Sequence, residues 1–192
     1  MSDARMVARA AGTLLEIVDG VGPDQWGAAT PCSEYDVKGL AHHLLFWGPS
    51  LVGAGRKEAV PPPAAAESDV EPVADWPTAL KEHVARTVEA WSEPDAWTGV
   101  THMGGPVELP ADLVGGMVVG EFVVHGWDLA RATGQTPEWD AELLDYLVVE
   151  VAKSAQQGRD MGIYGPEVEV PDTAPALHRV LALTGRDPHW AR

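Results

Sequence analysis

The sequence is poor in cysteine and in basic residues. Cys32 is the only cysteine among 192 residues, so the chain cannot form an internal disulfide, and we expect a reducing, cytoplasmic location. Lysine and arginine number 13 against 29 aspartates and glutamates, which gives a formal net charge of −16. Because phosphate groups are recognised by clustered positive charge, this balance argues against nucleic acid and anionic membrane surfaces as partners.

Long hydrophobic runs are also missing. No stretch approaches the ~18 consecutive apolar residues of a membrane span, and the first twenty residues alternate charged with apolar groups, unlike a signal peptide. A chain of this length buries about 70% of the surface that it would expose when unfolded. We therefore expect a soluble protein made of one domain, residues 1–192.

Apolar residues recur at intervals of three and four along five segments, which predicts five helices. The predicted helices cover residues 3–19, residues 37–52 behind a capping box of Ser33 and Asp36, residues 75–91, a segment from Pro110 to Gly134, and residues 140–157. Long helices with little strand predict an all-α protein built as an antiparallel helical bundle.

Three segments lack this period. Residues 53–74 contain three consecutive prolines and are either a mobile surface loop or a lid over a site. Residues 97–109 are typical of a small β-hairpin that turns at Gly104 and Gly105. Residues 158–192 are rich in glycine and proline, and we expect them to form an irregular C-terminal extension over the bundle.

The predicted helix 110–134 carries Glu121, His125 and Asp128 on one stripe of an otherwise apolar surface. Unpaired charge is costly to bury, so these groups need partners. Glu121 and His125, one turn apart, can both point at one divalent ion, or they can form a hydrogen bond inside a structural core. Asp128 either accepts a hydrogen bond behind a ligand or pairs with Arg131, and the pairing is favoured.

Two adjacent histidines, His42 and His43, lie on the predicted second helix. Neighbours on a helix differ by about 100° in direction, so only one can face a given point. The apolar pattern does not choose between them.

The other candidates are weaker. We expect His83 to be solvated on the rim of its helix, and His102, His178 and His189 have no neighbour at metal-ligand spacing. Cys32 precedes a helix, where the helix dipole lowers the pKa of a thiol, and it serves either packing or redox and ligand chemistry.

Three stretches resemble a known family. TPCSEYDVKGLAHHLLFW, ELPADLVGGMVVGEFVVHGWDLARATG and GPEVEVPDTAPALHRVLALTGRDPHW are similar to the DinB/YfiT-like metalloprotein superfamily, in the group related to the N-terminal domain of mycothiol-dependent maleylpyruvate isomerase. The resemblance implies a four-helix bundle that holds a divalent metal through one histidine of the second helix and a Glu–His pair of a later helix. In this sequence the Glu–His pair corresponds to Glu121 and His125. The family's histidine of the second helix lies eight positions after an aromatic residue, here Tyr35, so the resemblance implies His43.

Two imidazoles and one carboxylate leave a coordination position open. Such a donor set suits zinc first and nickel as an alternative. The resemblance implies an enzyme that uses a low-molecular-weight thiol such as mycothiol for transfer or isomerisation of a small-molecule substrate. A homodimer is compatible with the resemblance. A non-enzymatic metal or small-ligand binding protein and a metal-dependent hydrolase are the alternatives. A fourth ligand from the tail, for instance His178, would favour the binding protein.

Overall fold

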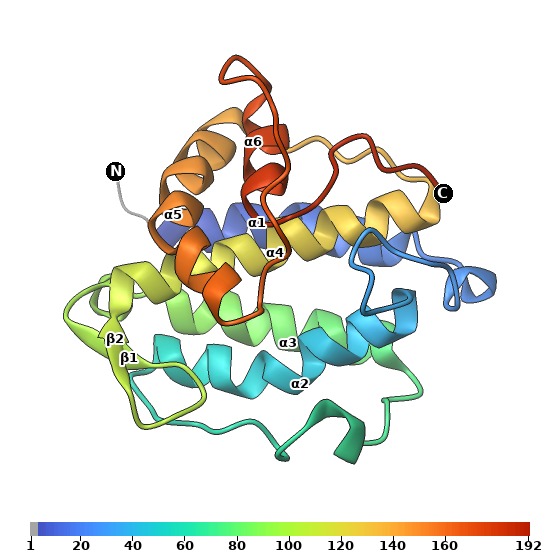
Figure 1. Ribbon diagram of the computed structural model, residues 1–192. Coiled ribbons are helices and arrows are strands. Elements are labelled where there is room, and N and C mark those ends of the chain that lie inside the picture. Colours follow the sequence, from blue (N-terminus) through green and yellow to red (C-terminus); the bar gives the residue numbers. More distant parts are fainter. Residues whose placement is uncertain (1–3) are drawn as a thin grey trace.

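The computed structural model describes residues 4–192 as six α-helices and one two-stranded sheet (Figure 1). The helices are α1 (Ala4–Asp19), α2 (Val37–Gly55), α3 (Trp76–Trp91), α4 (Ala111–Thr133), α5 (Ala141–Asp160) and α6 (Ala176–Leu183). Strands β1 (Val100–His102) and β2 (Glu108–Pro110) pair antiparallel. Short 3-10 turns cover Pro23–Gln25, Glu67–Asp69 and Pro94–Trp97. The mainly α fold and the small hairpin that the sequence predicts are confirmed.

Four helices enclose the core. Helices α1 and α2 each pack against α3 and α4, while α5 lies against α4 and α6 packs on α5 outside this bundle (Figure 1). The apolar stripe of each bundle helix supplies fully buried side chains, among them Leu14, Leu40, Leu80 and Phe122. Because each stripe meets the others in the middle, one continuous hydrophobic core joins the helices.

Helix α4 runs through the centre of the protein. Among the described residues it is the one helix long and apolar enough to cross a membrane by length and composition, but 78% of that window is buried inside the protein. A helix that is apolar on most sides satisfies this criterion when it is the core of a bundle. It ends as predicted at Gly134, which adopts a left-handed conformation with φ of 75°.

The start of α2 differs from the prediction. Asp36 is itself the cap, and its carboxylate accepts a hydrogen bond from the Gly39 amide at 2.7 Å. The predicted capping box of Ser33 and Asp36 is therefore wrong. Ser33 lies in a preceding turn, which the Thr30 hydroxyl holds by donating to the Tyr35 carbonyl at 2.8 Å.

The boundaries of other predicted segments also shift. Residue 3, the predicted start of the first helix, lies outside the described residues. Residues 53–55 continue α2 and do not begin the loop. The prediction that residues 158–192 pack irregularly is wrong for 176–183, which form α6, because Val180 and Leu181 bury an apolar face against the rest of the protein.

His83 is also not solvated as predicted. Its side chain is 3% exposed and lies between α3 and α2, where Thr87 Oγ1 is 3.2 Å from its Nε2. Gly48 on α2 makes the room, because a Cβ at that position would lie 2.5 Å from the imidazole ring. Burial lowers the pKa of His83 from 6.5 to about 4, and the charge of Arg86 adds to the effect.

This burial predicts an acid-sensitive stability. Between pH 6.5 and about 4 the unfolded chain binds a proton on His83 and the folded protein does not. The free energy of unfolding should therefore decrease by about 3 kcal/mol as the pH is lowered from 6.5 to about 4, and His83 should have no effect on its pH dependence above pH 6.5. Urea titrations at several pH values test this, and His83→Gln should lose that part of the slope. The exposed-site control His189→Gln should keep it, and equal slopes in the two variants would contradict the assignment.

Candidate metal centre

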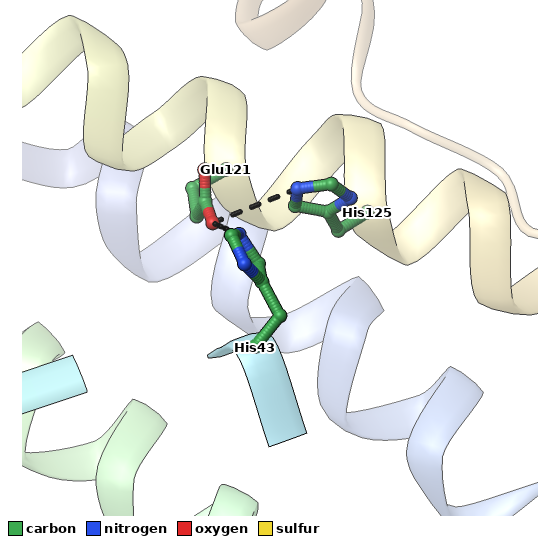
Figure 2. Close-up of side chains that lie close together, drawn as sticks. All are labelled: His43, Glu121 and His125. Atoms are coloured by element: carbon green, nitrogen blue, oxygen red, sulfur yellow. Dashed lines mark ion pairs between the residues drawn. The ribbon is translucent and has the colours of Figure 1, made fainter. Parts of the chain in front are cut away.

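Helices α4 and α2 bring three predicted ligands to one point (Figure 2). Glu121 and His125 lie one turn apart on α4, so both side chains leave the same face of this helix. Glu121 Oε1 is 3.6 Å from His125 Nε2 and 3.2 Å from His43 Nε2, which reaches it from α2. His43 thus faces the pair. The structure brings the three residues together, and their binding of a metal stays a prediction.

The geometry fits a divalent ion. Two donor atoms that each lie about 2.1 Å from a tetrahedral ion are separated by about 3.4 Å, and the two nitrogen–oxygen distances lie on either side of that value. One donor atom from each of the three residues lies within 4.8 Å of the other two. Nitrogen and carboxylate donors of this kind suit zinc or nickel.

Both histidines are held from behind by a carboxylate. His43 Nδ1 is 2.8 Å from Glu67 Oε1, and His125 Nδ1 is 3.0 Å from Asp128 Oδ2. Because an ionised carboxylate only accepts hydrogen bonds, each Nδ1–H donates, and each Nε2 is directed toward Glu121. Ligating histidines in proteins are commonly oriented in this way.

The charges of the cluster are strongly coupled. Burial by itself would lower the pKa of His43, but hydrogen bonds and charge from Glu121 and Glu67 outweigh it and raise the pKa to about 9. Burial would raise the pKa of Glu121, yet the charges of His125 and His43 lower it to about 2. At neutral pH the metal-free centre therefore holds a carboxylate beside a protonated imidazole. The proton between His43 Nε2 and Glu121 Oε1 lies among the three clustered donor groups, which a divalent cation would share.

The Asp128 carboxylate has a second partner. Arg186, which follows α6, contacts Asp128 Oδ2 at 3.2 Å, and neither side chain is more than 9% exposed. The favoured pairing of Asp128 with Arg131 is wrong, because Arg131 donates instead to the carbonyl oxygen of Trp190. The C-terminal segment is thus connected to the centre through Arg186, Asp128 and His125.

Comparison with known families shows to which family the chain belongs. The sequence profile of the mycothiol maleylpyruvate isomerase N-terminal domain matches residues 7–130. The chain belongs to this family. The matched range contains most of α1, all of α2 and α3 and most of α4, and therefore all three residues of the cluster.

Individual proteins also resemble the chain. The chain is 29% identical over 181 residues to uncharacterized proteins of two Mycobacterium tuberculosis strains, CDC 1551 and H37Rv, and the match covers 93% of this chain and 94% of theirs. The crystal structure of the mycothiol-dependent maleylpyruvate isomerase has a TM-score of 0.61 at 17% identity, covering 81% of this chain and 71% of the isomerase. A histidine-to-alanine mutant of that enzyme matches equally well at 16% identity. The structural likeness establishes a shared fold.

Glu67 is a residue of the centre that the sequence does not reveal. It belongs to the connection between α2 and α3, and its carboxylate accepts hydrogen bonds from Tyr35 and Trp47 as well as His43. Its backbone carbonyl lies 3.0 Å from His42 Nε2, which must donate to it. In this family member His42 therefore supports the connection, while the neighbouring His43 faces Glu121.

The remaining sequence candidates lie elsewhere. His178 and His189 pack against each other with ring centroids 5.5 Å apart, and among residues 4–192 neither joins a cluster with metal-ligand geometry. His102 is half-buried in β1. Burial raises the pKa of Cys32, although Arg186 opposes this, so the lowered pKa predicted from the helix dipole is wrong.

Proposed function

We propose that this family member binds one divalent metal through His43, Glu121 and His125 and uses a low-molecular-weight thiol to transfer or isomerise a small electrophilic substrate. Zinc is the expected ion, with nickel as the alternative, and mycothiol is the expected thiol. The observation that carries the metal proposal is the orientation of both imidazoles: each directs Nε2 toward Glu121 while a separate carboxylate accepts from its Nδ1.

The cluster is partly accessible from solvent. About a quarter of the Glu121 side chain is exposed, and His178 is outside the cluster. Three protein ligands and an open position are typical of catalytic rather than structural sites. A divalent ion at this point would hold a bound thiol as the nucleophilic thiolate.

The protein's own groups prepare this centre. Asp128 and Glu67 fix the tautomer of the two histidines, and the proton of His43 must leave before its Nε2 can act as a ligand. The net charge of −16 repels anionic thiols, so the local affinity has to come from the centre. The thiol itself is inferred from the family and from the named activity of the isomerase of the same fold.

Cobalt substitution tests the proposal. Cobalt–thiolate bonds absorb in the near ultraviolet, so mycothiol should generate a charge-transfer band in the cobalt form of the wild type and none in His125→Ala. Bacillithiol and glutathione report on which thiol is preferred. A wild-type spectrum that stays unchanged with every thiol at millimolar concentration would contradict the thiol mechanism and favour a hydrolase or a binding protein.

A further inference from the structure

The connection between α2 and α3, residues 56–75, is fastened to the rest of the protein mainly by polar contacts. None of its residues is buried, and the partly buried Val60 packs beside Gly53 near its beginning. Lys57 holds its beginning by donating to the carbonyl oxygens of Ala96 and Thr98. Its middle is held by the short turn Glu67–Asp69, whose Glu67 side chain is about three-quarters buried.

Three donors converge on the Glu67 carboxylate. Trp47 Nε1 donates to Oε1 at 3.1 Å, the Tyr35 hydroxyl donates to Oε2 at 3.1 Å, and His43 Nδ1 is 2.8 Å from Oε1. A carboxylate can accept all three bonds. Burial and the charge of Glu67 also raise the pKa of Tyr35, so its hydroxyl remains a donor. The same side chain therefore fixes both the connection and the ring of His43.

Glu67 lies outside the ligand set. It binds Nδ1 of His43, whereas Glu121 faces Nε2 of the same ring. The two carboxylates occupy opposite sides of the imidazole, so Glu67 acts on the centre through His43.

We infer that Glu67 is a positioning residue for His43 and that it makes residues 56–75 a lid, which is closed when Glu67 is bound to Tyr35, His43 and Trp47. Closure of this lid is coupled to metal binding. The inference rests on the proposed function. A closed lid holds His43 with Nε2 directed at the centre, and an open lid frees the ring. By linkage, the factor by which the Glu67 contact tightens metal binding equals the factor by which bound metal favours the closed lid.

The variant Glu67→Gln tests whether the carboxylate acts as a hydrogen-bond acceptor, because it leaves the size of the side chain unchanged. The amide keeps the size of the side chain but replaces one acceptor oxygen by an NH2 group, which then faces a donor. Removing such an outer partner of a ligand lowers metal affinity by about 10- to 100-fold. Zinc competition titrations should give this loss for Glu67→Gln and none for Glu71→Gln, an exposed glutamate of the same segment.

Hydrogen exchange supplies a readout independent of activity. Zinc should slow exchange of the amides of residues 64–72 in the wild type, by a factor similar to the affinity lost in Glu67→Gln, and should leave this segment unaffected in the variant. Tyr35→Phe removes one of the three donors while keeping the ring, so it should show the same two effects at smaller size if Glu67→Gln proves unstable.

The inference and the proposed function fail differently. The role of Glu67 would be overturned if Glu67→Gln binds zinc within about twofold of the wild type and zinc still protects residues 64–72 in it. The metal centre would stand in that case, provided that His125→Ala loses zinc. A wild-type protein that binds no zinc, cobalt or nickel would overturn the metal centre itself, and the lid coupling with it.

Discussion

Replacing His125 with alanine should lower zinc affinity by about 100- to 1,000-fold. Complete zinc sites release about 10–16 kcal/mol on binding, so one ligand of four contributes roughly 3–4 kcal/mol. His43→Ala and Glu121→Ala should cause losses of similar size, because His43 Nε2 and Glu121 Oε1 face the same point. Isothermal titration calorimetry or competition with a chromophoric chelator measures these affinities.

The neighbouring histidine provides the matched control. His42 donates to the Glu67 carbonyl and is not one of the three clustered donors, so His42→Ala removes no ligand and should lower zinc affinity far less than His43→Ala does. If His42→Ala loses the metal and His43→Ala keeps it, the assignment of the α2 ligand is wrong.

Acidification should also release the metal. The pKa of His43 is about 9 in the metal-free protein, and the residue must give up its proton when the metal binds. Zinc affinity should therefore decrease steadily as the pH is lowered from about 9. Retention of zinc at pH 4 would argue against a centre built on two imidazoles.

The helices and the α4 pair could be predicted because both depend on local periodicity. Glu121 and His125 are four residues apart on a buried stripe, and this spacing alone places them side by side. The choice between His42 and His43 could not be made from the apolar pattern, since both flank it, and only the register of the family favoured His43. Their directions in the structure depend on Glu67, a residue about 24 positions away.

The contacts that the sequence does not predict are long-range. Glu67 lies in a segment rich in proline and alanine, and Arg186 lies beyond the last helix, so no local period marks either residue. On α4, Asp128 is three residues from both His125 and Arg131, and helix geometry allows either partner. Arg186, 58 residues away, occupies the same carboxylate oxygen that accepts from His125. His83 was mispredicted for the same reason, because the missing side chain of Gly48 on another helix makes its space.

Asp128→Leu should destabilise the metal-free protein by about 3–5 kcal/mol. Asp128 is fully buried and Arg186 is 8% exposed, so the variant leaves the guanidinium buried without its counter-charge. It also removes the acceptor of His125 Nδ1–H. Urea unfolding in the presence of a chelator measures the effect, and Asp145→Asn, at an exposed position of α5, should change the free energy of unfolding by less than about 0.5 kcal/mol.

A double variant separates the buried charge from the lost packing. Two apolar side chains can replace a buried ion pair at little cost, whereas removal of one partner leaves an uncompensated charge. Asp128→Leu combined with Arg186→Leu should therefore recover more than half of the stability that Asp128→Leu loses. It should not recover zinc affinity, since His125 still lacks the carboxylate that orients it. Recovery of zinc affinity together with stability would mean that Asp128 acts only through the fold.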